Sequence, residues 1–177
     1  EDQISGLKQT EATLVFSTGY QANLGLISTL CQAGDLILSD ALNHASIIDG
    51  CRLSKANRQI YRHCDLDHLS YHLSETTASN RRWIITDGVF SMDGDVAPLP
   101  EILELAHRWD AYVIVDDAHG FGILGADGGG ATSHFGLKDD RIIHVGTLSK
   151  AVAGLGGYVS GKRVMIDLLI NRCRPFI

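Results

Sequence analysis

The stretch AYVIVDD, residues 111–117, is an almost wholly apolar run that ends in two carboxylates. A strand with so few polar positions is typical of a parallel sheet that is covered on both faces. Short β-branched runs alternate with segments of helical period along the chain, and this order predicts an α/β fold, a mostly parallel sheet with helices on both faces. The expected strands are residues 35–40, 57–63, 81–89, 111–117, 141–145 and 156–160.

Helices are expected between these strands. Residues 44–54 and 162–173 have a helical pattern, and Asp65 can cap a helix over 65–75. After the breaker APLP, residues 97–100, apolar positions at helical spacing mark another helix: Ile102, Leu105, Ala106 and Trp109. The last two strands follow each other so closely that we expect them to pair antiparallel.

The length of 177 residues suits a single domain, residues 1–177. The chain opens in a predicted charged helix and stops at RCRPFI, residues 172–177, without capping or tail composition. We therefore expect a fragment of a longer protein.

Charge and composition exclude several classes of protein. The net charge of -6, from 21 acidic and 15 basic side chains, gives no broad positive field for nucleic acid. No apolar run reaches the roughly 20 residues of a membrane-spanning helix, and residues 1–12 lack the layout of a signal peptide. A cytoplasmic protein is expected. The cysteines have neither C-x-x-C nor zinc-finger spacing, which favours free thiols over disulfides or a metal site: Cys31, Cys51, Cys64 and Cys173.

Lys150 directly follows the apolar strand at 141–145 and the segment GTLS. It is expected at the carboxyl edge of the sheet, where open α/β folds bind ligands. A lysine that acts as a covalent catalyst must present a neutral amine, which requires a confined, partly dry site or a nearby cation. The alternative is a solvated loop lysine.

Asp116 and His119, in VIVDDAHG, follow another buried strand. A carboxylate there can keep a pyridine nitrogen protonated, so that the ring withdraws electrons, and a histidine can donate to the phenolic oxygen of the ring. Taken alone, this motif is equally compatible with a metal site or a polar strand end.

Several further residues lie at predicted strand ends. Gly19 and Tyr20, in VFSTGYQAN, precede a helical pattern whose first N–H groups can bind a phosphate, and Thr147 can add a hydroxyl. His44 could stack on a flat ring and Ser91 could bond its oxygen. Ordinary capping and turn roles are the alternatives for each residue singly.

Five motifs taken in order, FSTGYQAN, NHAS, TDGVFSMDGDVAPLPEI, VDDAHGFG and GTLSKAVAGLGGY, resemble the α-oxoamine synthases. These are pyridoxal phosphate enzymes of fold type I, and the resemblance covers about residues 6–174. The resemblance implies that residues 1–177 are the large, cofactor-binding domain of such an enzyme, and that they lack its N-terminal segment and its C-terminal small domain. Phe121 and Cys64 depart from the pattern, which commonly has a smaller residue and an asparagine there.

The resemblance also implies roles for the site residues. Lys150 would join the cofactor covalently and later remove the α-proton of an amino acid, Asp116 would pair with the pyridine nitrogen, and His119 would bond the phenolic oxygen. His44 would stack on the ring, Ser91 would lie by that oxygen, and the phosphate would contact the remaining three: Gly19, Tyr20 and Thr147.

The implied reaction is an acyl transfer in a homodimeric enzyme. An amino acid condenses with an acyl-CoA or acyl-carrier-protein thioester, with loss of carbon dioxide. The motifs are most similar to the branch of the family that joins alanine to a pimeloyl thioester in biotin biosynthesis. The alternative is the branch that acetylates glycine. Because residues of missing segments complete such sites, we expect weak or no turnover from these residues alone.

Two rival functions are weighed against this one. GFGILG, residues 120–125, matches the dinucleotide fingerprint G-x-G-x-x-G, but that motif requires a strand, a glycine turn and a helix in immediate succession. Here DDAH precedes the glycines and ADGGGATS, with no helical period, follows them. An inactive cofactor-binding domain is disfavoured by the presence of Lys150, Asp116 and His119.

Overall fold

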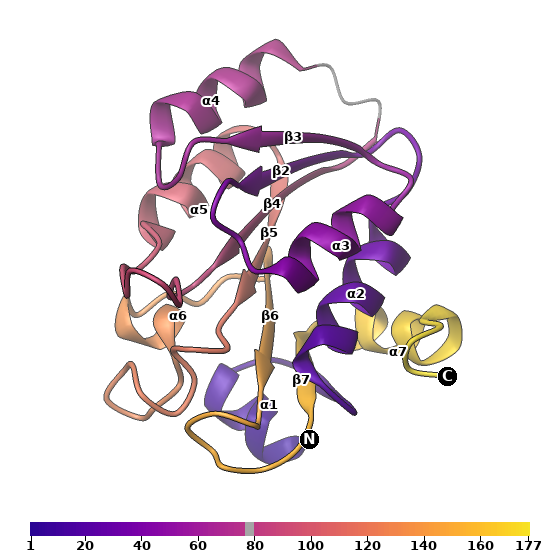
Figure 1. Cartoon of the computed structure of the whole chain (residues 1–177), viewed down its shortest axis with the longest axis vertical. Helices are drawn as coiled ribbons and strands as arrows, with labels where there is room; N and C mark the ends of the chain where they lie inside the picture. The colour runs from indigo at the N-terminus through magenta and orange to yellow at the C-terminus, as the bar shows by residue number, and fades with distance from the viewer. Residues whose placement is uncertain (77–79) are drawn as a thin grey trace.

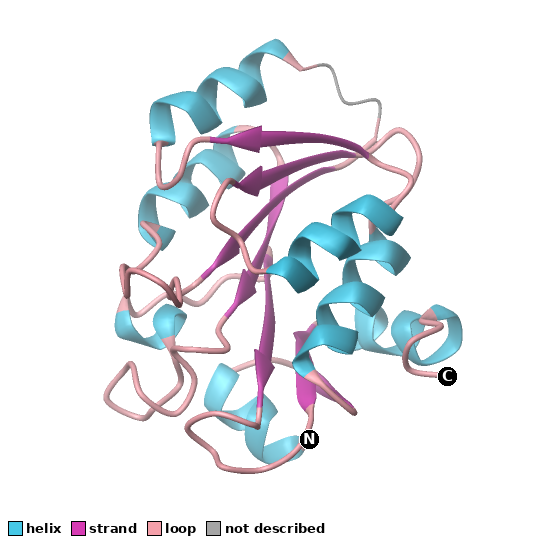
Figure 2. Cartoon of the chain, in the orientation of Figure 1, coloured by secondary structure: helices cyan, strands magenta, loops and turns pink. Residues whose placement is uncertain are grey.

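A computed structural model of the chain describes residues 1–76 and 80–177. A twisted seven-stranded sheet runs through the molecule with helices on both sides (Figures 1 and 2). The elements, in chain order, are α1 (Asp2–Lys8), β1 (Ala12–Phe16), α2 (Gly19–Leu30), β2 (Leu36–Asp40), α3 (Ala45–Leu53), β3 (Asn57–Tyr61), α4 (Leu66–Glu75), β4 (Arg82–Asp87), α5 (Leu99–Arg108), β5 (Ala111–Asp116), α6 (Ala131–His134), β6 (Ile142–Thr147), β7 (Gly157–Gly161) and α7 (Arg163–Arg172).

The sheet has the strand order β1-β7-β6-β5-β4-β2-β3. Its five strands from β6 to β3 are parallel, and β7 pairs antiparallel with both β6 and β1. The predicted α/β class, the parallel sheet and the antiparallel pairing of the last two predicted strands are confirmed. The edge position of β1 was not predicted, because a short apolar run does not indicate which strand it pairs with, here β7.

Two apolar cores lie on opposite faces of the sheet. One contains Leu26 of α2, Ile47 of α3 and Leu169 of α7, and the other contains Leu69 of α4 and Ile102 of α5. All five side chains are nearly or completely buried. In Figure 1, α2, α3 and α7 lie on one side of the strands and α4, α5 and α6 on the other. The helices expected from the sequence form within one or two residues of their predicted bounds.

Local signals explain where several helices begin. Asp65 caps α4 by accepting a hydrogen bond from the His68 N–H, as predicted. Thr18 caps α2 through a bond from the Gln21 N–H. After Gly125 the chain continues in turns, and the four-residue α6 begins at Ala131, so no helix follows the glycines of GFGILG directly. The dinucleotide fingerprint therefore lacks the structure it requires.

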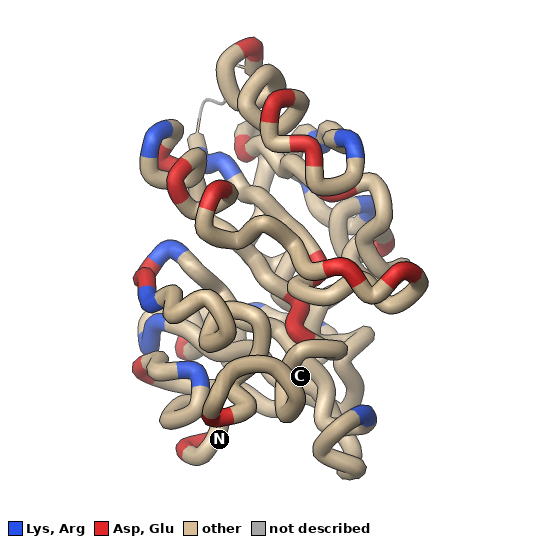
Figure 3. Tube along the Cα trace, turned by 90° about the vertical axis from the view of Figure 1, so that its left-hand side faces the viewer, with Lys and Arg blue, Asp and Glu red and all other residues tan. Residues whose placement is uncertain are grey.

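In the view of Figure 3, Lys and Arg positions are interspersed with Asp and Glu positions along the trace. None of the helices in the described part of the chain combines the length and apolar content that crossing a bilayer requires. All four cysteines are free thiols; Cys64 is half-buried and the other three are buried.

Candidate active site

The parallel strands and β1 bring their carboxyl ends to one edge of the sheet, because strands that run the same way end at the same edge. The ends are Phe16 of β1, Asp40 of β2, Tyr61 of β3, Asp87 of β4, Asp116 of β5 and Thr147 of β6. In open α/β sheets this edge is the usual location of a ligand.

A pocket of about 250 Å³ lies at that edge, a volume below the roughly 300–1,000 Å³ usual for small-molecule pockets and suited to a one-ring ligand. It is lined by all eight residues predicted for the site: Gly19, Tyr20, His44, Ser91, Asp116, His119, Thr147 and Lys150. It is also lined by residues that the sequence analysis did not select: Thr18, Asn23, Ser46, Asp87, Ala118 and Ser149.

Lys150 and His119 meet on one side of the pocket. The Nζ atom of Lys150 lies 2.8 Å from Nε2 of His119, although 31 positions separate the two residues. Burial, and then the positive charge of Lys150, lower the pKa of His119, so its ring is neutral at neutral pH and can accept a hydrogen bond from the ammonium. The histidine ring thus holds the amine of Lys150 in the pocket.

The amine is not shielded from water by this chain. Lys150, Ser149 and Ala151 are exposed, and so are His44 and Ser91. A catalytic lysine was expected in a confined, partly dry site, and residues 1–76 and 80–177 do not provide that confinement. The exposure of Lys150 depends on which other segments cover its loop, and a local sequence pattern does not predict those contacts.

Asp116 forms the floor of the pocket. Asp116 is only 5% exposed. Its Oδ1 accepts a hydrogen bond from the Ala118 N–H at 3.0 Å, and its Oδ2 accepts one from the Asn23 amide at 2.6 Å. The same Asn23 amide nitrogen lies 3.0 Å from Oγ of Ser46, whose Oγ lies 2.7 Å from Nδ1 of His44. A continuous polar chain therefore links the buried carboxylate to the histidine at the opposite wall.

Asp87 lies beside Asp116 in the sheet, because the two residues are partners in the β4–β5 register. Burial, and then the neighbouring Asp116 carboxylate, raise the pKa of Asp87 to about 8. Its Oδ2 accepts a hydrogen bond from the His44 N–H, which fixes the start of α3. The Asp87 carboxyl group is thus protonated at neutral pH.

The first turn of α2 lies against Thr147. A Cβ on Gly19 would stand 3.1 Å from Cβ of Thr147, so glycine allows this close approach. The first helical bond of α2 runs from the Ala22 N–H to the Thr18 carbonyl, and the N–H groups of Gly19 and Tyr20 precede it. Such N–H groups at a helix start bind anions.

Three of the predicted residues also have the ordinary structural contacts that were weighed as alternatives. His44 is the N-cap of α3 and accepts a bond from the Ser46 N–H. Tyr20 donates from its hydroxyl to Asp49 across 2.6 Å, and the Thr147 hydroxyl donates to the Gly156 carbonyl across 3.0 Å. These contacts orient the side chains at the pocket wall.

Asn23 and Asp87 are the main residues that sequence reasoning missed. Asn23 lies on the face of α2 that also buries Ala22, Leu26 and Ile27, and a buried polar residue in an apolar stripe was an available signal. Asp87 ends a buried strand as Asp116 does, and the same strand-end argument applies to it.

Phe121, the departure noted in VDDAHGFG, does not line the pocket. Its ring packs edge-on against Tyr158 with 5.0 Å between centroids, and it lies under the Lys8 ammonium. The larger side chain is accommodated in the core next to the buried Lys8–Asp117 ion pair.

Comparison with known families identifies the architecture. Residues 3–177 match the family described as aminotransferase class I and II. The chain belongs to this family. Its fold is that of the pyridoxal phosphate enzymes of fold type I, as predicted, and it is similar to solved structures of α-oxoamine synthases.

Individual relatives carry related names. The chain is 53% identical, over 177 residues, to an 8-amino-7-oxononanoate synthase from Lysinibacillus sphaericus, a match that spans 100% of this chain and 46% of the relative. A serine palmitoyltransferase from S. paucimobilis with a bound PLP–myriocin aldimine superposes with a TM-score of 0.95 at 38% identity, covering 100% of this chain and 44% of that one. An 8-amino-7-oxononanoate synthase from Francisella tularensis superposes at 0.85 and 33% identity, covering 100% and 51%. The chain spans about half the length of the relatives it matches.

Proposed function

We propose that this chain is the cofactor-binding part of a pyridoxal phosphate-dependent α-oxoamine synthase. The observation that carries the proposal is the arrangement of Lys150, His119 and Asp116 around one pocket at the carboxyl edge of the sheet. An amine, a neutral imidazole and a buried carboxylate stand there on three sides of a space suited to one ring.

The chemistry of the pocket fits pyridoxal phosphate. The cofactor carries an aldehyde, a pyridine nitrogen, a phenolic oxygen and a phosphate, and the pocket offers a partner for each. These are the Lys150 amine, the Asp116 carboxylate, the His119 ring and the first turn of α2 with Thr147. Ser91 lies at the same pocket and His44 has a ring able to cover one face of the cofactor.

Each residue has a definable task. When bound, pyridoxal phosphate supplies a ring that spreads the negative charge developed at the α-carbon of an amino acid. Asp116 keeps the ring nitrogen protonated, and Asn23 holds that carboxylate in place through its 2.6 Å bond. Lys150 would bind the cofactor aldehyde, and its Nζ, when free, would accept the α-proton of the amino acid.

His119 and the helix start orient the bound groups. The neutral His119 ring can hold the Lys150 ammonium after proton transfer, because the two nitrogens already lie 2.8 Å apart. The N–H groups of Gly19 and Tyr20 would hold the phosphate.

We further propose that the reaction is the condensation of L-alanine with pimeloyl-CoA or a pimeloyl carrier protein. The products are 8-amino-7-oxononanoate, carbon dioxide and the free thiol, in biotin biosynthesis. The 53% identity to a relative of that name supports this choice. The alternative is glycine C-acetyltransferase activity. Assembly as a homodimer and a location in the cytoplasm stay predictions.

The experiment that tests the function uses the full-length protein loaded with pyridoxal phosphate. Its absorption near the visible edge should change when alanine is added, and mass spectrometry should detect 8-amino-7-oxononanoate when a pimeloyl thioester follows. A spectral response to glycine with acetyl-CoA, and none to alanine, would assign the alternative. No cofactor band that depends on Lys150 would refute the proposal.

A further inference from the structure

A second cluster of reactive side chains lies outside the pocket, where β2, the β3–α4 connection and the loop between β4 and α5 meet. His63 contacts Asp40 through Nδ1 at 2.9 Å and Asp95 through Nε2 at 2.5 Å. The thiol of Cys64 lies 3.6 Å from the same Nε2 and 4.0 Å from Oδ2 of Asp95. A sulfur, a nitrogen and a carboxylate oxygen therefore converge on one point.

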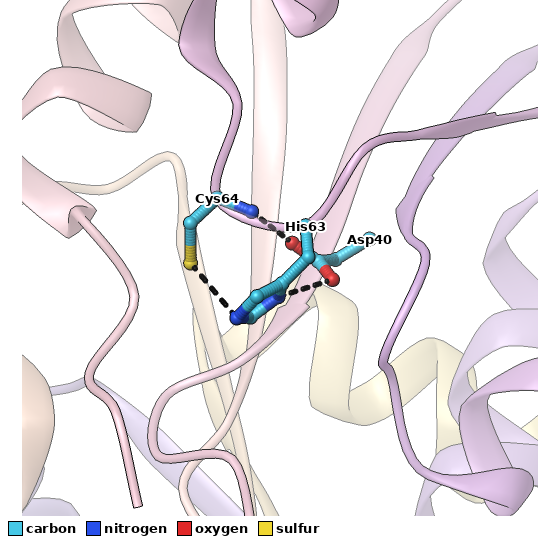
Figure 4. Close-up of side chains that lie close together, drawn as sticks. All are labelled: Asp40, His63 and Cys64. Atoms are coloured by element: carbon cyan, nitrogen blue, oxygen red, sulfur yellow. Dashed lines mark hydrogen bonds and ion pairs between the residues drawn. The ribbon is translucent and has the colours of Figure 1, made fainter. Parts of the chain in front are cut away.

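The backbone is shaped to aim these atoms. Cys64 has a φ of 51°, in the left-handed region that few non-glycine residues adopt. Its N–H donates to Oδ2 of Asp40 across 2.9 Å, which holds this conformation. Figure 4 shows the Cys64 sulfur directed at one ring nitrogen of His63 while Asp40 faces the other.

Asp40 is built to orient rather than to bind. It is only 3% exposed, and its two carboxylate oxygens accept from Nδ1 of His63 and from the N–H groups of Leu42 and Cys64. A histidine that binds a metal through one ring nitrogen usually donates the N–H of its other ring nitrogen to a carboxylate. That hydrogen bond fixes the tautomer and the orientation of the ring.

We propose that His63 Nε2, Cys64 Sγ and Asp95 Oδ2 form a binding site for Zn²⁺, with Asp40 as the outer partner that orients His63. Thiolate, imidazole and carboxylate together favour zinc over calcium or magnesium, which prefer oxygen ligands alone. A water molecule would complete a four-coordinate shell. The assignment does not depend on the proposed reaction.

The distances suit this ion. Zinc bonds of about 2.3 Å to sulfur and about 2.0–2.1 Å to nitrogen place tetrahedral ligand atoms about 3.6 Å apart. The Cys64 and His63 atoms already have that separation, 3.6 Å. The ion would take the place of the hydrogen bond between His63 Nε2 and Asp95 Oδ2, and the separation of these two atoms would widen from 2.5 Å to about 3.4 Å. Binding also releases the thiol proton of Cys64 to solvent.

The ligands are accessible and carry no competing cation. The side chains of His63 and Asp95 are 25% and 39% exposed, so an ion can enter from solvent. Oδ1 of Asp95 is buried and has no hydrogen-bond partner in residues 1–76 and 80–177; a metal ion or its water could supply one. The only ion pairs of Asp40 and Asp95 among the described residues are those with His63.

The ion would link two segments: the β4–α5 loop, which contains Ser91 and Asp95, and the residues that follow β3, His63 and Cys64. The His63 ring packs edge-on against Phe90, with 4.4 Å between centroids, and a bridge between Val89 and Val96 closes the loop. Because Ser91 follows Phe90 and lines the pocket, the proposed zinc site fixes one wall of it from outside.

The test uses the full-length protein, stripped of metal with a chelator and titrated with Co²⁺. Cobalt replaces zinc and absorbs in the red when thiolate binds it in four-coordinate geometry, where pyridoxal phosphate does not absorb. We expect one Co²⁺ per chain, bands that disappear when Zn²⁺ is added, and binding weaker by about 10–100-fold in Asp40→Asn.

The matched variants are Cys64→Ala and Cys51→Ala, since Cys51 is a buried free thiol of α3 in the core on the opposite face of the sheet from Cys64. The bands should be lost in Cys64→Ala and kept in Cys51→Ala. Asp95→Asn changes a half-exposed ligand and should also weaken Co²⁺ binding, which keeps the test valid if Cys64→Ala does not fold. Absence of red bands in the unsubstituted protein, or equal bands in Cys64→Ala, would overturn the proposal.

Discussion

The amide nitrogen of Asn23 lies 2.6 Å from Oδ2 of Asp116, across 93 positions of sequence. Asn23 is buried in α2, and Asp116 ends the central strand β5. The helix thereby sets the direction of the carboxylate that we expect to contact the ring nitrogen of the cofactor. The same helix begins with the N–H groups that we expect to bind its phosphate, so α2 positions both ends of one small molecule.

Asn23→Ala should weaken pyridoxal phosphate binding by about tenfold or more. Hydrogen bonds to a charged group contribute roughly 1.5–3 kcal/mol, and the substitution leaves Asp116 with the Ala118 N–H alone. Fluorescence titration of the full-length apoprotein measures the dissociation constant. Asn171→Ala is the control, because the Asn171 amide bonds an exposed carbonyl of α7. Equal affinities in both variants would show that Asn23 does not support the site.

Asp87 should make the cofactor-free protein less stable as the pH rises. The folded protein keeps a proton on Asp87 up to a pKa of about 8, whereas the ordinary value is 3.8, so the folded state binds more protons between these values. Stability falls with pH wherever the folded state binds more protons. Asp87→Asn removes this loss and can keep the bond from the His44 N–H.

The comparison of wild type with Asp87→Asn is made by urea unfolding at about pH 6 and about pH 8.5. The free energy of unfolding of the variant should rise relative to wild type by on the order of 2 kcal/mol between these pH values. A difference that does not change with pH would mean that Asp87 is ionised throughout.

Lys8→Met should destabilise the protein by roughly 3–5 kcal/mol. The Nζ atom of Lys8 lies 2.5 Å from Oδ2 of Asp117, both side chains are fully buried, and removal of the cation leaves an unpaired charge in the core. The double variant Lys8→Met/Asp117→Asn should recover part of the loss, because asparagine can still accept from the Ala131 N–H. Denaturant unfolding measures both. If the double variant is less stable than Lys8→Met, groups other than Lys8 stabilise the negative charge of Asp117.

The sequence predicted the residues that line the pocket better than the residues that support them. Lys150, Asp116, His44 and Ser91 were found because each follows a run that is readable as a strand, and the carboxyl ends of parallel strands share one edge. The eight predicted residues do line one pocket, while their individual roles stay proposals.

What escaped prediction depends on contacts across long sequence separations. Asn23 stands out in the sequence only as a polar residue in an apolar helical stripe, and its partner Asp116 lies 93 positions away. The Lys8–Asp117 pair joins residues 109 positions apart, and the first predicted helix gave no sign that its lysine is buried. Cysteine spacing likewise favoured free thiols without a metal site, because the cluster at Cys64 draws its partners from β2 and from the loop after β4.

The central claim is that the amine of Lys150 joins pyridoxal phosphate covalently, and reductive trapping tests it most directly. The full-length protein is loaded with the cofactor, reduced with borohydride, digested and analysed by mass spectrometry. We predict one pyridoxyl group per chain, on the peptide that contains Lys150, and none in Lys150→Ala. A pyridoxyl group found instead on Lys8, Lys55, Lys138 or Lys162 of the unsubstituted protein would contradict the account.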